Sequence, residues 1–203
     1  MEFLLLLVLV LLGVLVVLVQ RRREWAAGRH RAGARLRERT LFDLQPGDIV
    51  QGDGRDWVVE ERLLYDDSGF QWLEYALRDG AERRWLVVCE DDWLEVDWLE
   101  PISLTPVLPL PAAIDWQGQR YHLEEEGTAR ISRTQAAMNH RLGTCRYADY
   151  AGPDQRRLCV ERWSSSARSD GEARPAEIEV TAGRRIEPLS LSLLPGNGQP
   201  VYR

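Results

Sequence analysis

The side chains that could carry out metal or thiol chemistry are few and lie far apart in this sequence. The cysteines and histidines show none of the close spacings that metal sites use, such as C-x-x-C. An odd number of cysteines predicts free, buried thiols. The residues concerned are Cys89, Cys145, Cys159, His30, His122 and His140. We therefore assign no metal ligand from the sequence.

Two acidic triplets, Glu90-Asp91-Asp92 and Glu124-Glu125-Glu126, could supply a pair of carboxylates for acid–base chemistry. Successive side chains of a strand point to opposite faces, so neighbouring acids in a regular strand do not form a pair. Charged runs of this kind more often form a solvated strand edge. No G-x-S-x-G turn presents a nucleophile, and "LPGNGQP" lacks the G-K-[ST] of a phosphate loop. The sequence therefore assigns no catalytic residue, no cofactor and no cofactor-binding residue.

The charge of the chain is unevenly distributed. Residues 1–39 carry eight Arg against three Glu, a charge of +5, and the remaining residues carry 18 Arg against 29 acids, a charge of −11. The acidic body opposes contact with phosphate groups, so we expect no nucleic acid partner. We expect the Arg83-Arg84 and Arg156-Arg157 pairs, which have acids nearby, to form ion pairs across strands.

The N-terminus predicts a membrane anchor over residues 1–20. Residues 3–19 are apolar without interruption, and 17 residues of helix rise about 25 Å, close to the thickness of a bilayer core. A cleaved signal peptide is the alternative, but no positive side chain precedes the run and no small residues end it. Arginines that follow a span stay on the cytoplasmic side. We therefore expect a single-pass protein of the bacterial inner membrane, with its N-terminus outside and its body in the cytoplasm.

Residues 21–39 form a basic segment beside this predicted span. Arg21, Arg22 and Arg23 could contact anionic lipid, and Trp25 could lie near the headgroups. The alternative is that the arginines only set the orientation of the span and that Trp25 is an ordinary helix residue. These four residues are the candidate membrane-proximal site.

Past residue 40 the sequence predicts short strands separated by turns. Turn signals recur at Pro46-Gly47-Asp48, Asp66-Asp67-Ser68-Gly69 and Asp79-Gly80. The runs between them are rich in aromatic and β-branched residues, and "WLEVDWLEPI" alternates between apolar and polar side chains. This pattern predicts an antiparallel meander over residues 40–104.

The second part of the body repeats features of the first in the same order. "GRDWVVEE" at residues 54–61 is echoed by "GQRYHLEE" at residues 118–125, an offset of 64. Three further matches, at offsets of 75, 73 and 87, join Trp72 and Tyr75 to Tyr147 and Tyr150, Arg83-Arg84 to Arg156-Arg157, and Glu100-Pro101 to Glu187-Pro188. We interpret the repeat as an internal duplication. The alternative is chance similarity between strand-rich segments.

The repeat predicts a mainly β fold in which an N-terminal transmembrane helix precedes two related antiparallel β-meanders. We expect the meanders to pack as a sandwich or as a pair of barrel-like halves, with Trp57 and Tyr121 at matching positions. The first half covers residues 40–104, a Pro-rich connector residues 105–113, the second half residues 114–195 and a tail residues 196–203. Because a domain as small as one half is marginal alone, we expect each half to depend on the other.

An ordered set of motifs resembles a bacterial family that is named only as domain of unknown function 4178. The motifs are "LQPGDIV", "DWVVEE", "WLEY", "ERRWLVVCEDDW", "YHLEEEGTARI", "CRYADY", "LCVERW" and "RRIEPLSLSLLP", within residues 40–195. The resemblance implies a domain that follows a membrane segment, in gene neighbourhoods of membrane-stress and polyamine-related proteins. It brings no established catalytic residues to this chain.

Two functional hypotheses follow. The first is a binding or scaffold module that holds a partner protein at the inner membrane, in a membrane-stress setting. The alternative is an enzyme or binder that acts on a small cationic substrate such as a polyamine, with acidic residues as its site. A clustered acidic pocket with a perturbed carboxylate would favour the alternative, whereas exposed strand edges and an apolar patch would favour the module. The sequence leaves the partner and the oligomeric state open.

Overall fold

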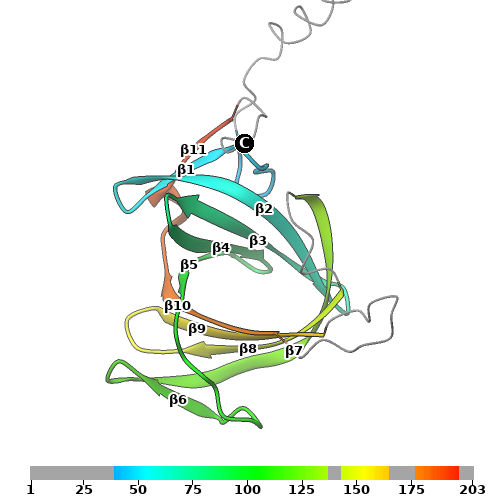
Figure 1. Ribbon diagram of the computed structural model, residues 1–203, viewed down its shortest axis with the longest axis vertical. Coiled ribbons are helices and arrows are strands. Elements are labelled where there is room, and N and C mark those ends of the chain that lie inside the picture. The colour runs from blue at the N-terminus through cyan, green and yellow to red at the C-terminus, as the bar shows by residue number, and fades with distance from the viewer. Residues whose placement is uncertain (1–38, 137–142, 165–176, 197–203) are drawn as a thin grey trace, which may run out of the picture. The chain divides into compact units, whose positions relative to one another are not determined.

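The strand-rich body predicted from the sequence is present in the structure. A computed structural model describes residues 39–136, 143–164 and 177–196, all of which belong to one compact unit over residues 38–203. Apart from one short 3₁₀-helix, the regular elements in these residues are all β-strands, as Figure 1 shows. The prediction of a mainly β fold is therefore confirmed.

The predicted membrane segment lies outside the part of the chain that the structure describes. This holds for the anchor over residues 1–20 and for residues 21–38 of the basic segment, with Arg21, Arg22, Arg23 and Trp25. Residues 197–203 of the predicted tail lie outside it as well. Among the described residues, no helix has the length and apolar character needed to cross a membrane.

In the described part of the chain, eleven strands form one antiparallel sheet that contains two five-stranded meanders. The first meander consists of β1 (Ile49–Gly52), β2 (Arg55–Asp67), β3 (Phe70–Asp79), β4 (Glu82–Glu90) and β5 (Leu94–Pro101). The second consists of β6 (Ala113–Trp116), β7 (Gln119–Ala136), β8 (Gly143–Ala151), β9 (Arg156–Ser164) and β10 (Glu177–Arg185). The 3₁₀-helix η1 (Pro188–Ser190) and β11 (Ser192–Leu194) follow.

The two meanders are joined edge to edge by strand pairing. The strand order is β11-β1-β2-β3-β4-β5-β10-β9-β8-β7-β6, and β2 pairs with β7 in addition. Eight strands, β2 to β5 and β7 to β10, therefore close into a ring, as Figure 1 shows. The prediction of a sandwich or a pair of barrel-like halves did not include this closure by edge pairing. The physical reason for the closure is that each meander leaves open edges, and pairing with the other meander satisfies their backbone hydrogen bonds.

Matching turns begin the two meanders. Asp53-Gly54 joins β1 to β2, and Gln117-Gly118 joins β6 to β7; all four residues have positive φ, as two-residue type I′ turns require. Beyond these turns, Trp57 pairs with Val50, the second residue of β1. Tyr121 pairs with the second residue of β6 in the same way. The predicted match between Trp57 and Tyr121 is therefore confirmed.

Other predicted matches between the meanders shift by one or more residues. In the first half, Val58 pairs with Arg78, which pairs with Arg83. In the second half, His122 pairs with Ala151, which pairs with Arg157. Arg83 therefore corresponds to Arg157, and not to Arg156 as the sequence predicted. Trp72 pairs with Tyr65, and Cys145 pairs with Ala129. Because Tyr65 and Ala129 lie 64 residues apart, as Val58 and His122 do, Trp72 corresponds to Cys145 and not to Tyr147. The offset between the halves is 64 residues on β2, 73 on β3 and 74 on β4, so the connections between strands differ in length while the bulges of β2 and β7 match.

The pairing across the two seams is symmetric. At the β5–β10 seam, Leu99 pairs with Gly183 and Pro101 with Thr181, on either side of the Glu100–Ala182 pair. At the other seam, Asp66 of β2 pairs with Arg130, which holds the same position in β7. Each seam therefore pairs a position with its own counterpart, which is the arrangement that a two-fold axis generates. Glu187-Pro188 lies beyond β10 and does not correspond to Glu100-Pro101 as predicted.

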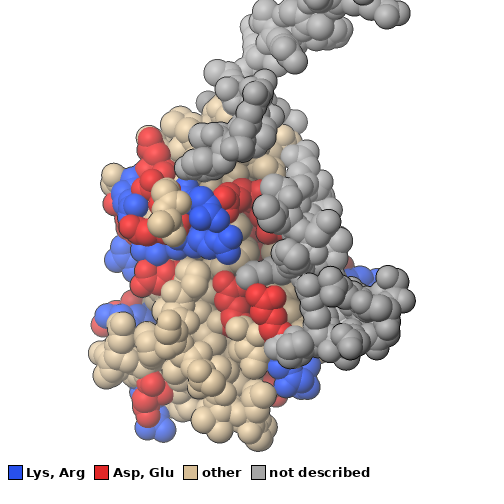
Figure 2. All heavy atoms as spheres, in the orientation of Figure 1, with Lys and Arg blue, Asp and Glu red and all other residues tan. Residues whose placement is uncertain are grey.

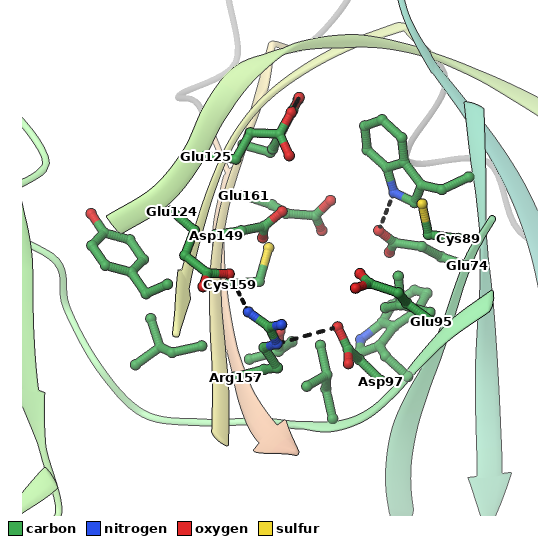
Figure 3. A pocket seen from close by; sticks show the side chains of 18 of the residues that line it. Glu74, Cys89, Glu95, Asp97, Glu124, Glu125, Asp149, Arg157, Cys159 and Glu161 are labelled. Atoms are coloured by element: carbon green, nitrogen blue, oxygen red, sulfur yellow. Dashed lines mark hydrogen bonds and ion pairs between the residues drawn. The ribbon is translucent and has the colours of Figure 1, made fainter. Parts of the chain in front are cut away.

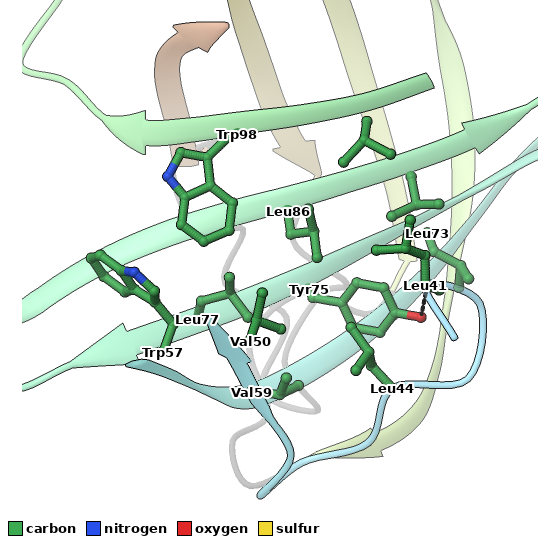
Figure 4. Packing of buried hydrophobic residues seen from close by; sticks show 12 residues of the cluster. Leu41, Leu44, Val50, Trp57, Val59, Leu73, Tyr75, Leu77, Leu86 and Trp98 are labelled. Carbon is green, nitrogen blue, oxygen red and sulfur yellow. Dashed lines mark hydrogen bonds between the residues drawn. The ribbon is translucent and has the colours of Figure 1, made fainter. Parts of the chain in front are cut away.

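Each meander curls around a hydrophobic core of its own. The first core, shown in Figure 4, includes Trp57, Leu77 and Trp98, and Tyr75 donates a hydrogen bond from its hydroxyl to the carbonyl of Leu41 at 2.8 Å. The second core is built from Ile114, Tyr121, Ala148, Tyr150, Leu158, Val160, Val180 and Ala182. A third cluster, which includes Tyr65, Trp72, Trp85 and Trp163, lies on the strand faces that point away from both cores.

The segments that follow the two meanders are exchanged between the cores. After β5, Ile102, Leu104 and Leu110 pack against the second core, and the carbonyl of Pro111 accepts a hydrogen bond from Tyr150. After β10, Ile186, Leu191 and Leu193 pack against the first core. β11 then pairs with β1, although the sequence analysis placed residues 114–195 in the second half. The Pro-rich connector and β11 thus each complete the other meander's core.

Candidate functional site

A cavity of about 320 Å³ lies between the two halves. Its walls are residues of β3, β4 and β5 on one side and of β7, β8, β9 and β10 on the other, as Figure 3 shows. This volume lies at the lower end of the range of sites for small molecules, roughly 300–1,000 Å³. The cavity is therefore the candidate site.

Strand alternation explains why polar side chains line the middle of the protein. On β5, Val96 and Trp98 are buried in the first core, whereas Glu95 and Asp97 line the cavity. Successive side chains of a strand point to opposite faces, so an apolar face toward the core leaves the polar face toward the other half. β9 follows the same alternation toward the second core. The two polar faces then meet around the cavity.

Acidic side chains dominate the cavity wall. Among the described residues that line it, seven carboxylates stand against two guanidinium groups, an excess of five negative charges when all are ionised. The acids are Glu74, Glu95, Asp97, Glu124, Glu125, Asp149 and Glu161, and the bases are Arg157 and Arg185. On the face shown in Figure 2, a group of acidic side chains lies at the level where the two halves meet. The site thus attracts cations and repels anions.

The two arginines cross-link strands at one end of the cavity. Arg185 of β10 donates to both carboxylate oxygens of Asp97, at 3.0 and 3.5 Å, and pairs with Glu95. Arg157 of β9 pairs with Glu124, and its Nε lies 4.0 Å from a carboxylate oxygen of Asp97. These partners come from both halves, so the ion pairs hold the halves together beside the cavity.

Asp149 has the most perturbed carboxyl group in the cavity wall. Burial raises the pKa of Asp149 to about 6, although a hydrogen bond from the Cys159 thiol acts in the opposite direction. Asp149 and Cys159 lie directly opposite each other on β8 and β9. Among the described residues, no ion pair joins Asp149 or Glu125 to an arginine. These two carboxylates are the ones most available to a cationic ligand.

The cysteines beside the cavity are not set up as nucleophiles. Burial, followed by the charge of Glu95, raises the pKa of Cys89 to about 11. Burial and then the charge of Asp149 raise the pKa of Cys159 well above its usual value. A thiol in such surroundings stays protonated at neutral pH and is inert.

Aromatic side chains form another part of the cavity wall. Trp72 donates its indole N–H to Glu74 at 3.0 Å, and its ring contacts Tyr147 edge to face at 5.1 Å between centroids. The hydroxyl of Tyr147 donates to Glu125 at 3.2 Å or to Asp67 at 3.1 Å. Phe70 and Trp85 also line the cavity. The wall therefore offers flat apolar surfaces next to carboxylates.

The structure brings only part of the predicted acidic triplets to the site. Glu124 and Glu125 both line the cavity, because a β-bulge between Leu123 and Glu125 breaks the alternation of β7. The expectation that adjacent acids point to opposite faces is therefore wrong at this position. Residues 90–92 are exposed and do not line the cavity.

Sequence reasoning missed five of the cavity acids, Glu74, Glu95, Asp97, Asp149 and Glu161. Each is a single acid on the polar face of a strand, and such residues normally face solvent. The signal that could have found them was the repeat itself, because two similar halves must bring two like faces together. The predicted ion pairs across strands are present for Arg84 with Glu100, at 2.8 Å, and for Arg157 with Glu124.

The described residues contain no group of three or more His, Cys, Asp or Glu side chains arranged to hold a metal ion. The carboxylates of the cavity wall are thus spread around the space and do not converge on one point. This arrangement suits a ligand with several charges better than a single ion.

Comparison with known proteins identifies the family. The family model described as "Domain of unknown function (DUF4178)" matches residues 45–188. The chain belongs to this family. The matched residues run from the turn before β1 to the start of η1, so they include both meanders and every residue that lines the cavity.

Relatives of this DUF4178 chain occur in distant bacteria. An uncharacterised protein of Aquifex aeolicus (strain VF5) is 23% identical over 164 residues, which are 76% of this chain and 85% of that protein. An uncharacterised protein of Mycobacterium tuberculosis (strain H37Rv) is 41% identical over 49 residues, 24% of each chain. No solved structure matches this chain.

Proposed function

We propose that the cavity between the two halves binds a small organic cation of the polyamine class. The observation that carries this proposal is the wall of seven carboxylates and two arginines, in which Glu125 and Asp149 have no arginine partner among the described residues. Asp149 is half-buried, and a buried carboxylate attracts a positive charge more strongly than one in water does. Binding a cation there relieves the mutual repulsion of the acids.

The chemistry of the wall favours an organic cation over a metal ion. An alkyl polyamine consists of ammonium groups joined by apolar methylenes. Carboxylates such as Glu125 and Asp149 would pair with the ammonium groups, while the rings of Trp72 and Trp85 would cover the methylenes and make cation–π contacts. Metal ions require ligands that converge on a point, and the described residues do not offer such a group. We therefore favour a binding protein for the ligand, with no catalytic step.

Titration calorimetry of the full-length protein in detergent tests the proposal. We expect 1,4-diaminobutane to bind, n-butylamine to bind more weakly, and the uncharged isostere 1,4-butanediol not to bind at all, at constant ionic strength. Asp149→Asn should weaken the diamine at least about fivefold, because it removes one free carboxylate from the wall. Asp115→Asn is the matched control, since Asp115 is 71% exposed on β6, outside the cavity. Equal binding of diol and diamine, or an equal loss in both variants, would contradict the proposal.

The N-terminal sequence supports a proposal for the setting of this function. We propose that residues 1–20 anchor the protein in the inner membrane with the body in the cytoplasm, and that Arg21, Arg22, Arg23 and Trp25 lie at the membrane surface. A scaffold role for a partner protein fits the same setting, and cation binding would then report to that partner. A reporter fused to the C-terminus should be active only in the cytoplasm, and activity in the periplasm would overturn this orientation.

We also propose that the two meanders arose by internal duplication. The equal turns at Gly54 and Gly118, the bulges at Glu60 and Glu124 and the symmetric seams support this origin. Such a duplication accounts for the cavity, because two copies of one polar face meet across the symmetry axis.

A further inference from the structure

Arg157 differs from the other arginine of the cavity wall in how firmly it is held. Arg185 is fixed by both oxygens of Asp97 and by Glu95. Arg157 has one close carboxylate, Glu124, and a second one 4.0 Å away, Asp97. Its Nε–H is buried without a hydrogen-bond acceptor among the described residues. Arg157 is therefore a charged group with incomplete partners at the edge of an acidic cavity.

The partners of Arg157 come from different halves of the protein. Glu124 belongs to β7 in the second meander, and Asp97 belongs to β5 in the first. Figure 3 shows the guanidinium group between these two carboxylates, at the end of the cavity away from Glu125. Arg157 thus occupies Glu124, which would otherwise be available to a ligand, and adds a positive charge beside Asp97. Its side chain is 16% exposed, so its charge is only partly screened by water.

We propose that Arg157 is the specificity-determining residue of the cavity and limits the number of ammonium groups that the ligand can place there. This inference rests on the proposed binding of an organic cation. In the wild-type protein Arg157 neutralises the Glu124–Asp97 end, so one end of a ligand is held near Glu125 and Asp149 and a further ammonium group meets a like charge. Without Arg157, the same end offers the carboxylate of Glu124 to that ammonium group, while Asp97 stays paired with Arg185.

The charge of the ligand decides how large the effect is. A diamine that binds mainly at the Glu125 end gains little from the loss of Arg157. A tetramine spans more of the cavity. In the wild type its additional ammonium groups are repelled by the guanidinium of Arg157, whereas in the variant they are attracted by the carboxylate of Glu124. We expect Arg157→Gln to tighten spermine at least about tenfold, equivalent to about 1.4 kcal/mol. For 1,4-diaminobutane we expect less than about threefold.

The experiment compares 1,4-diaminobutane, spermidine and spermine on the full-length protein by titration calorimetry, at constant ionic strength. Arg157→Lys keeps the positive charge and should retain the wild-type order of affinities. Arg120→Gln is the matched control, because Arg120 is 64% exposed and pairs only loosely, at 3.8 Å, with Asp115 on the surface. A thermal unfolding curve for each variant establishes that it is folded. If Arg157→Gln does not fold, Arg157→Met takes its place, because methionine also removes the charge and fills much of the same space.

The outcomes separate this inference from the proposal on which it rests. A selective gain for spermine in Arg157→Gln, absent in Arg157→Lys and Arg120→Gln, would support it. Binding to Arg157→Gln in the absence of binding to the wild type would show that Arg157 blocks the site, and would overturn both the proposed function and this inference. If the wild type binds the diamine and Arg157→Gln shows no change in preference, Arg157 does not set specificity, although the cavity still binds cations. If no protein binds any of the amines, the proposed function and this inference both fail.

Discussion

Replacing Gly183 with alanine tests whether the β5–β10 seam holds the two halves together. Gly183 pairs with Leu99 at this seam. A Cβ atom at Gly183 would lie 2.0 Å from the carbonyl oxygen of Trp98 and 2.9 Å from the Cα of Leu99. Both atoms belong to the backbone of β5, so no side-chain rotation can relieve the clash. The strands must move apart at this point.

The cost follows from the bonds that such a separation breaks. Overpacking costs about 1–3 kcal/mol, and each lost backbone hydrogen bond of the seam costs about 0.5–1.5 kcal/mol. We expect Gly183→Ala to lower the free energy of unfolding by about 2–4 kcal/mol. For a domain of this size, that corresponds to a melting temperature lower by about 5–12 °C.

The assay is thermal unfolding followed by circular dichroism, with Gly118→Ala as the matched control. Gly118 has φ of +74°, and a Cβ atom added there would meet no other atom within 4 Å, so the same substitution adds only backbone strain of about 1–2 kcal/mol. Gly183→Ala should therefore unfold at a lower temperature than Gly118→Ala. A Gly183→Ala protein that melts within about 1 °C of the wild type, or above Gly118→Ala, would refute the role given to this seam.

Three further predictions concern the pH dependence, the core and the halves. Burial raises the pKa of Asp149 to about 6 from its ordinary value of 3.8. Between these two pH values the carboxyl group binds more protons in the folded state than in the unfolded state. Ionisation of Asp149 therefore destabilises the folded protein as the pH rises through about 6. Chemical denaturation should therefore show that the stability of Asp149→Asn relative to the wild type increases between about pH 4.5 and 7.5, by on the order of 1–2 kcal/mol. If the difference in unfolding free energy between the two proteins does not change with pH, the raised pKa of Asp149 is wrong. Trp57 is 1% exposed and Trp93 is 69% exposed, so Trp57→Ala should cost about 3–5 kcal/mol in urea unfolding and Trp93→Ala less than about 0.5 kcal/mol, and similar costs would show that the first core is misplaced. Residues 40–104 and 112–203 expressed separately should lack dispersed amide signals, because each core needs side chains from the other segment; a half that folds alone would show that the halves are autonomous.

The local structure of the body was largely predictable from sequence. Gly54 and Gly118 each follow a polar residue between two apolar runs. This pattern predicts two-residue turns, because glycine readily adopts the positive φ that such turns require. The alternation of "WLEVDWLEP" likewise predicts that Val96 and Trp98 share one face and Glu95 and Asp97 the other. Both features depend only on residues close in the chain, and both agree with the structure.

The closure of the sheet and the site were not predictable in the same way. β7 is long enough to pair with both β8 and β2, but no residue within Gln119–Ala136 predicts which distant strand it pairs with. β11 has only three residues, and its partner β1 lies far earlier in the chain. The bulge at Glu124 turns two adjacent acids into the cavity, which reverses a correct general rule about strands. These features depend on pairing between strands that are far apart in the sequence. The sequence pattern of acids on a polar strand face is the same whether that face contacts solvent or the other half.

The exchange of segments between the two cores has a consequence for synthesis on the ribosome. The first core needs Ile186, Leu191 and Leu193, and β1 needs β11 as its neighbour. The first meander is therefore translated early but lacks its cover until residues 186–194 have been made, and its strands carry exposed apolar side chains and an open edge throughout that interval. The second meander has no such delay, because the segment that covers its core precedes it in the chain. The nascent protein should thus complete its C-terminal meander first and close its N-terminal one last.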